Sequence, residues 1–534
     1  MSARKGTAGI VASGHQATSA AGRQVLEAGG NAFDAVLGAL GASMVCEPLL
    51  TSLAGGGFLL ARPANRPVEV FDFFVQTPSK KRPEAELDFH PVVADFGTAT
   101  QEFHVGLGAA AVPGTAAGLL DIHAALGALP LGEVLAPAIQ LARDGVEVTP
   151  YQAYISTVLK SIVALSPEAT ALVAPEPLCA ESGTARPAVA GETIRNPELA
   201  DAFEALVREG KSWFYAGGPA RRLVADCRER GGQLSLDDLA GYEVLRRRPV
   251  HTRAFGAEFW FNPPPSPGGS LVAFALALLE PLPLRSAAWD APEARLAVVR
   301  AMEAANRLRS DTVMDRLDEA LAAELLGEDR VAAWRGDALS KDLFSRGTTH
   351  LSVADEYGNL ASLTSSNGEG CGYVIPGTGI MMNNMLGEED LNPDGFHRWT
   401  PGTRLASMMC PTLARLAHGG EVALGTGGSN RIRGAVLQVL LNLCAFGLPL
   451  RRAVESPRLH LEGGQLSVEA GLPEPALARL EAQVAAQGWP PIEHWPEPSL
   501  FFGGVHAVER LANGGFRGAG DFRRGGAVAE ALRA

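Results

Sequence analysis

The sequence has few cysteines and no long apolar run. Only six of its 534 residues are cysteines, and no two of them form a Cys-x-x-Cys pair. This spacing offers neither a disulfide framework nor a zinc pattern, so we expect mostly buried free thiols. They are Cys46, Cys179, Cys227, Cys371, Cys410 and Cys444. No apolar stretch reaches the ~20 residues of a transmembrane helix, and none follows the basic residues of the N-terminus. The sequence therefore predicts a cytoplasmic protein with no membrane partner.

The sequence also has fewer basic than acidic residues. Lysine and arginine together number 46 against 59 aspartates and glutamates, and the formal net charge is -13. A nucleic-acid-binding protein needs a basic surface to neutralise phosphates, so this class is excluded. Hydrophobic residues make up 46% and charged residues 20%, which is ordinary for a soluble globular enzyme. The length suffices for a large core and for two or more domains.

One polar stretch, residues 347–364, has the pattern of a β-hairpin. Residues 348–353 alternate between two faces, residues 356–359 have turn composition, and residues 360–364 alternate again. On periodicity alone this is a plain strand with a polar face. Helices are predicted for residues 17–29, 32–45, 119–126, 135–144, 270–279, 292–309 and 432–446. Ser235 is expected to cap a further helix with Asp238 at its third position.

A glycine triplet, Gly55–Gly57, raises the question of a phosphate-binding loop. No Gly-Lys-Ser or Gly-Lys-Thr follows it, and a strand rather than a helix is predicted to start there. Glycine in a strand is more often a place where backbones approach closely. We therefore expect tight packing at this triplet.

Several ordered motifs resemble one known family. They are Gly29–Ala35, Gly108–Gly118, Pro263–Gly269, Gly347–His350, Gly377–Asn384, Arg404–Thr412 and Ala453–His460. Together they cover nearly the whole chain, and they resemble the γ-glutamyltranspeptidases, a branch of the N-terminal-nucleophile hydrolase superfamily. The resemblance implies an α+β fold, the four-layer αββα sandwich of that superfamily.

The same resemblance implies that the chain cuts itself between Gly347 and Thr348. The products would be a large chain, 1–347, and a small chain, 348–534, which remain packed as one intertwined catalytic domain. Thr348 would then carry both the nucleophilic hydroxyl and a free α-amine. Because such an amine has a reference pKa of about 7.7–8.0, it can serve as the base that a threonine hydroxyl needs. No metal or cofactor is required.

The resemblance also assigns roles around the nucleophile. Gly427–Gly428 would form the oxyanion hole, because backbone N–H groups at a helix N-terminus stabilise negative charge. Ser366 would hydrogen-bond the new amine of Thr348. For His350 we favour a structural role, and likewise for Asn383–Asn384.

The substrate pocket departs from the family pattern. Phe74 stands where close relatives carry the arginine that holds the substrate α-carboxylate, and phenylalanine cannot pair a carboxylate. Ser407 matches a family position, and the acidic cluster Glu388, Glu389 and Asp390 supplies candidates for binding a substrate amine. Arg404 is a candidate for the missing cation.

These features imply an enzyme that transfers an acyl group from a small-molecule amide to water or an amine. A γ-glutamyltransferase or glutathione hydrolase is the first interpretation. A related acylase or amidohydrolase, of the oxamate or the glutaryl and cephalosporin type, is the second, and a non-cutting relative that only binds is the third. The loop 390–404 is too short for the lid typical of the bacterial enzymes, so we expect hydrolysis to exceed transfer.

Overall fold

The computed structural model describes residues 5–95, 100–175, 186–311 and 348–533, together with positions 320, 326 and 327. Two large sheets lie face to face in it. The first has seven strands, in the order β22 (Ala527–Ala531), β1 (Gly9–Ser13), β11 (Thr349–Asp355), β12 (Leu360–Ser366), β2 (Gly56–Arg62), β3 (Glu69–Phe73) and β8 (Leu245–Arg247). The second has six, in the order β21 (Phe516–Ala519), β20 (Gly504–Arg510), β16 (Glu421–Gly427), β15 (Thr412–Arg415), β10 (Ala257–Phe261) and β9 (Val250–Ala254).

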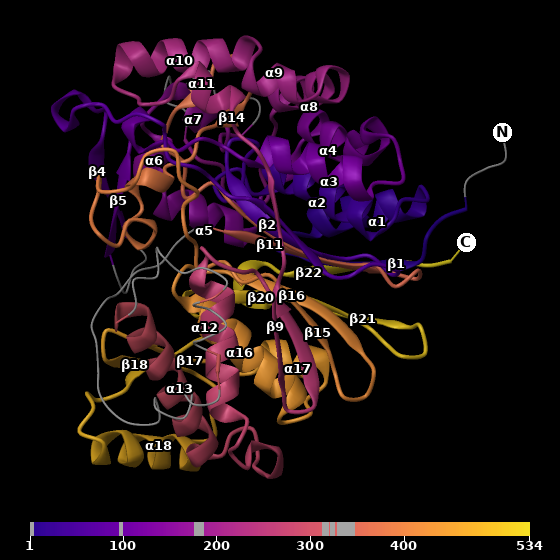
Figure 1. Ribbon diagram of the computed structural model, residues 1–534, viewed down its shortest axis with the longest axis vertical. Coiled ribbons are helices and arrows are strands. Elements are labelled where there is room, and N and C mark those ends of the chain that lie inside the picture. Colours follow the sequence, from indigo (N-terminus) through magenta and orange to yellow (C-terminus); the bar gives the residue numbers. More distant parts are fainter. Residues whose placement is uncertain are drawn as a thin grey trace.

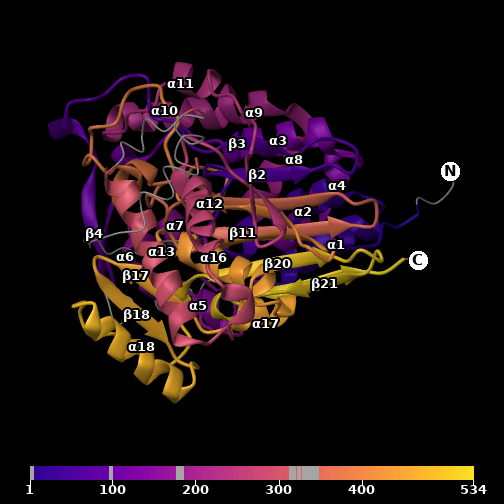
Figure 2. The same ribbon diagram turned by 60° about the horizontal axis from the view of Figure 1, so that its bottom comes forward.

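Helices cover the outer face of each sheet, which gives the αββα sandwich that the family resemblance predicts (Figure 1). The seven-stranded sheet carries α1 (Gln16–Glu27), α2 (Ala32–Cys46), α3 (Thr115–Leu126), α4 (Leu131–Asp144), α8 (Pro197–Glu209), α9 (Lys211–Tyr215), α10 (Gly218–Arg230) and α11 (Leu236–Ala240) on its side. The six-stranded sheet carries α12 (Pro267–Leu279), α13 (Pro292–Asp311), α16 (Arg431–Cys444) and α17 (Leu450–Glu455). Figure 2 shows α17 packed beneath β20 and β21 of the second sheet.

Smaller elements fill the ends of the sandwich. They are α5 (Pro150–Val158), α6 (Lys160–Val163), α7 (Pro167–Ala171), α18 (Glu474–Ala486), the pairs β4 (His90–Asp95) with β5 (Thr100–Val105), β6 (Val146–Glu147) with β7 (Thr193–Ile194) and β13 (Val374–Ile375) with β14 (Ile380–Met381), and the sheet β17 (Leu459–Glu462), β18 (Gln465–Glu469), β19 (Glu493–Trp495). Short 3₁₀ turns lie at η1 (Glu84–Glu86), η2 (Leu107–Ala109), η3 (Leu284–Ser286), η5 (Met385–Gly387), η6 (Glu389–Leu391), η7 (Leu500–Phe502) and η8 (Phe522–Arg524).

Helix α2 shows how the sequence builds a layer. Its N-terminus is closed by a capping box, in which Asn31 accepts from the amide of Asp34 and Asp34 accepts from that of Asn31. All fifteen of its residues are buried, because the helix lies between its neighbours α1 and α4 and strand β11. Its alanines and glycines permit this close approach, and a helix that is apolar all round belongs in such a place.

Most predicted elements are present. The hairpin forms from β11 and β12, and Ser235 caps α11 with Asp238 as expected. Helices α3 and α4 begin four residues earlier than predicted, because their first turns follow Gly114 and Pro130 rather than the first apolar repeat. Within the described ranges, no helix has both the length and the apolar composition for a membrane crossing.

Segments before and after position 348 interleave in both sheets. The later segment supplies β11, β12 and β22 to the first sheet and β15, β16, β20 and β21 to the second. The earlier segment supplies the remaining strands, and β1 lies between β11 and β22. A break in the chain before position 348 would therefore leave the two pieces joined by strand pairing.

Candidate active site

The expected nucleophile lies at the start of a central strand. Thr348 directly precedes β11 and is 6% exposed. The ladder pairs Thr349 with Ser365, and continued by one residue this register places Thr348 opposite Ser366 at the end of β12. Ser366 Oγ accepts from the amide of Gly368 at 2.9 Å. Gly347, the other side of the expected cleavage bond, falls outside the described residues.

The two candidate oxyanion glycines lie against Thr348. Gly427 ends β16, and a Cβ added to it would lie 2.1 Å from the Thr348 carbonyl oxygen, so only glycine permits this contact. Gly428 has φ +128°, a conformation that favours glycine. The chain then turns into α16, whose first residue, Arg431, donates its amide to the Gly428 carbonyl at 3.0 Å. The fold thus brings Thr348 and the glycine pair together, while their roles as nucleophile and oxyanion hole stay predictions.

A buried acid, Glu47, contacts Thr349, the residue after the expected nucleophile. Glu47 is not among the candidates predicted from the sequence. Glu47 follows α2 and is 3% exposed, and its Oε2 accepts from Thr349 Oγ1 at 3.0 Å. Burial raises the pKa of Glu47 to about 7, against the opposing effects of the Thr349 hydrogen bond and the charge of Arg524. The sequence does contain a signal for such a buried acid, because Glu47 interrupts an apolar run directly before Pro48.

His350 has a structural environment, in keeping with the role that we favoured. Its imidazole is fully buried, with Nδ1 2.8 Å from Thr364 Oγ1 and Nε2 2.9 Å from Ser352 Oγ. Burial lowers the pKa of His350 well below its ordinary value, so the ring is neutral. It packs directly on Gly425 and ties the two sheets together.

The glycine triplet packs tightly, as expected, and supports the end of β12. A Cβ on Gly55 would lie 2.3 Å from the Ser366 carbonyl oxygen, and one on Gly57 would lie 2.3 Å from the Thr364 carbonyl oxygen. The Asn383–Asn384 pair is structural as well. Asn383 Nδ2 donates to the carbonyls of Ala54 and Ala111, which binds three segments of the chain together beneath the site.

The acidic run divides into three environments. Glu388 is 5% exposed, and its Oε1 lies against Gly368, beside the loop that holds Ser366. Glu389 is exposed. Asp390, the third member of this acidic cluster, accepts from Ser429 Oγ at 2.7 Å and so adjoins the Gly427–Gly428 turn. This hydrogen bond links Asp390 to the oxyanion candidates.

The other substrate candidates have structural contacts. Ser407 is 5% exposed, its Oγ accepts from the amide of Met409 at 3.1 Å, and its own amide donates to Ser266 Oγ at 3.2 Å. Phe74 is fully buried and stacks on Phe58 with ring centroids 5.4 Å apart. Their roles in substrate binding stay predictions.

Arg404 is held by contacts within the protein. Its guanidinium donates to the Phe74 carbonyl, to the Tyr242 hydroxyl and to the Glu243 carbonyl, and its Nε lies 3.6 Å from Asp72 Oδ1. It also lies over the Tyr242 ring, 4.7 Å from the centroid. To bind a substrate carboxylate as predicted, Arg404 would have to exchange several of these contacts.

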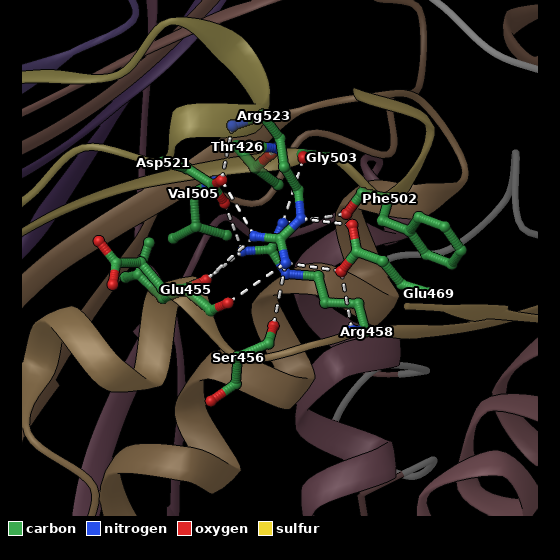
Figure 3. A network of polar contacts seen from close by, with 12 residues as sticks. Thr426, Glu455, Ser456, Arg458, Glu469, Phe502, Gly503, Val505, Asp521 and Arg523 are labelled. Carbon is green, nitrogen blue, oxygen red and sulfur yellow. Dashed lines mark hydrogen bonds and ion pairs between the residues drawn. The ribbon is translucent and has the colours of Figure 1, made fainter. Parts of the chain in front are cut away.

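A dense ion network holds the C-terminal turn next to the site (Figure 3). Arg523 pairs with Glu469 at 2.6 Å and with Asp521 at 3.1 Å, and Arg458 pairs with Asp521 at 2.5 Å. Arg458 Nη1 also donates to the carbonyls of Phe502 and Gly503. The network fixes η8, the turn that carries Arg524, whose guanidinium lies beside Gly427.

Comparison with known proteins identifies relatives over most of the chain. Residues 18–531 match the family model described as gamma-glutamyltranspeptidase. The chain is 32% identical over 494 residues to the acylase ACY 1 proenzyme of Pseudomonas sp. (strain SE83), covering 90% of this chain and 87% of that one. It is 27% identical over 559 residues to the glutathione hydrolase proenzyme of Bacillus subtilis (strain 168), covering 98% and 91%.

Solved structures with the same fold include a cephalosporin acylase from Bacillus halodurans, with a TM-score of 0.81 at 24% identity over 99% of this chain and 97% of that one. The gamma-glutamyltranspeptidase of Helicobacter pylori gives a TM-score of 0.51 at 26% identity over 61% of this chain and 91% of that one.

Proposed function

Since the chain belongs to the γ-glutamyltranspeptidase family, we propose that it cuts itself before Thr348 and then uses this residue to transfer acyl groups from small-molecule amides. The chain is an enzyme of the N-terminal-nucleophile type. Its best-supported activity is hydrolysis of γ-glutamyl amides such as glutathione. The observation that carries the proposal is the convergence of Thr348, which directly precedes β11, with Ser366 and Gly427, which end β12 and β16.

Self-cleavage proceeds by an acyl shift. The hydroxyl of Thr348 attacks the carbonyl carbon of Gly347, the peptide C–N bond breaks, and an ester forms while the hydroxyl proton passes to the departing amine. Water then hydrolyses the ester, which releases the Gly347 carboxylate and restores the Thr348 hydroxyl next to a free amine. Catalysis repeats the attack on a substrate amide. The amine takes the hydroxyl proton and returns it to the leaving group, and Gly427–Gly428 stabilise the oxyanion.

The decisive experiment compares purified wild type with Thr348→Ala. Wild type should give two chains of roughly two-thirds and one-third of the 55.9 kDa mass, with the smaller beginning at Thr348 by N-terminal sequencing. Thr348→Ala should stay in one piece without activity. Thr403→Ala, a change at an exposed threonine, is the matched control and should be cut normally. An active single-chain wild type, or a different new N-terminus, contradicts the proposal.

A second candidate is an acylase for acyl groups that lack the α-amino acid end of glutamate. Two observations favour it: Phe74 is buried in the position of the family's carboxylate-binding arginine, and Arg404 is already engaged within the protein. The identity to an acylase proenzyme agrees with them. A panel of γ-glutamyl, glutaryl and oxamate amides separates the candidates. A higher kcat/KM for the glutaryl amide supports the acylase, and a micromolar KM for glutathione refutes it.

The same assays test the fate of the acyl group. We expect release to water to exceed transfer to a dipeptide acceptor at neutral pH, because the short loop 390–404 leaves the acyl-enzyme open to water. A transfer rate well above the rate of hydrolysis contradicts this.

A further inference from the structure

Arg524 reaches the nucleophile from the C-terminal turn η8. It is 4% exposed, and its aliphatic stem packs on Gly504. On one side of Gly427, the position that a Cβ would occupy is 3.0 Å from Arg524 Nη1 and 2.1 Å from the carbonyl oxygen of Thr348. The guanidinium and the backbone of Thr348 therefore meet at the same glycine. Arg524 Nη2 lies similarly close to Gly428, at 3.3 Å from the Cβ position.

The charge of Arg524 is not neutralised by a direct ion pair within the described part of the chain, and its buried Nε has no hydrogen-bond partner there. It acts electrostatically on Glu47, on Tyr151 and on His506. Glu47 is the acidic member of this group, and its carboxyl accepts a hydrogen bond from Thr349, the residue after Thr348. A cation and an acid thus flank the first two residues of the small chain.

We propose that Arg524, with Glu47 as its counter-charge, keeps the new amino group of Thr348 neutral at the pH of catalysis. The inference rests on the proposed cleavage before Thr348. The amine must be neutral to accept the hydroxyl proton, and a fixed cation nearby disfavours its protonation. Glu47 acts in the opposite sense when ionised. Arg524 acts through the amine and touches neither substrate nor the hydroxyl in this scheme.

Other titratable groups lie around the start of β11. His350 on β11 and His506 on β20 are buried, and burial lowers the pKa of each, that of His506 to about 4, so both are neutral near pH 7. Burial raises the pKa of the Tyr151 hydroxyl on α5, so it also is neutral. Asp521 on the C-terminal turn is paired with Arg458 and Arg523. Two further acids lie nearby, Asp390, which accepts from Ser429 beside Gly428, and Glu388, which lies against Gly368 next to Ser366. Glu47 is the acid bonded to the residue after Thr348, and Arg524 is the cation that meets the Thr348 backbone at Gly427.

The test is the pH dependence of kcat/KM for the amide that wild type hydrolyses best, measured on mature two-chain protein. On the acid side of this pH profile, the acidic limb, activity falls as the amine becomes protonated. Arg524→Met should move this limb upward by about one pH unit, because removal of a nearby cation raises the pKa of the amine. Glu47→Gln should move it downward. Arg524→Lys, which keeps the charge, should restore the wild-type limb.

The matched control is Arg517→Met, the same change at an arginine whose side chain is 57% exposed on β21, and it should leave the limb in place. A purely structural role for Arg524 would lower activity at every pH without opposite shifts from the two variants. The proposal is overturned if Arg524→Met leaves the limb unmoved, or if both variants move it in one direction. If Arg524→Met does not mature, Glu47→Gln decides alone, and an unmoved limb overturns the proposal. An uncut wild type would instead refute the proposed function.

Discussion

Two consecutive arginines of the C-terminal turn have opposite electrostatic surroundings. Arg523 is surrounded by acceptors: two ion pairs to Glu469 and Asp521, and carbonyls of residues 454–456 (Figure 3). Arg524 is equally buried but makes no ion pair in the described structure and lies beside Gly427. Burying a charge is costly unless it is paired and hydrogen-bonded.

The comparison shows where the described part of the protein buries an arginine without an ion pair. The paired arginine fixes the position of a turn, which is a structural role. The unpaired one lies beside Gly427, close to the Thr348 carbonyl, and its charge acts on Glu47. Changes in the network should therefore alter stability, and changes around Arg524 should alter chemistry.

The largest expected effect comes from Arg523→Met. It leaves Glu469 and Asp521 buried without one of their partners, and breaking a buried pair in this way typically costs about 3–5 kcal/mol. We would measure the free energy of unfolding in urea, with Thr348→Ala as the uncut background so that one chain unfolds. A loss below about 1 kcal/mol would show that the network does not hold the turn.

A smaller effect, on activity, is expected for Ser429→Ala. The hydrogen bond from Ser429 to Asp390 joins the acidic run to the oxyanion turn. A hydrogen bond to a charged group contributes about 1.5–3 kcal/mol, so kcat/KM should fall by at least about tenfold. Unfolding in the uncut background should change much less. A large loss of stability with normal kcat/KM would reverse our assignment of this bond to the site.

Glu47→Gln should change how stability depends on pH. The pKa of Glu47 is raised to about 7 by burial, so its contribution is present below its ordinary pKa of 4.5 and is lost as pH rises through 7. The variant does not lose this contribution. Its free energy of unfolding should therefore rise relative to that of wild type between pH 5 and pH 7.5, by on the order of 1 kcal/mol. Urea midpoints of both proteins in the uncut background measure it. If the stability of the two proteins depended on pH in the same way, a group other than Glu47 would be responsible for the titration.

The smallest effect is expected at an exposed pair. Arg143 lies 2.8 Å from Glu204 and 3.3 Å from Asp201, with about half of its side chain exposed. Solvent and salt screen such pairs, so Arg143→Ala should leave the free energy of unfolding close to that of the uncut background in the same assay. A cost near that of Arg523→Met would remove the contrast between buried and exposed charge on which the comparison depends.

Local pattern was enough to predict the hairpin, the capped helices and the close-packed glycines. Alternation places Thr348 and His350 on one face of a strand, and glycine runs mark contacts such as Gly55 on the Ser366 carbonyl. The motif resemblance supplied the layered fold, since no periodicity specifies which strands become neighbours. The substrate residues were harder, because Arg404 and Phe74 were read by position alone and their partners come from distant segments.

By itself the sequence determined the family, the nucleophile candidate and the absence of any motif for a metal or a nucleotide. Only the tertiary structure decided that Glu47 and Arg524, 477 positions apart, meet at one end of β11. Their positions depend on how α2 packs on the first sheet and on how an ion network fixes η8. Such long-range juxtapositions arise from packing and charge balance, which leave no periodic signal along the chain.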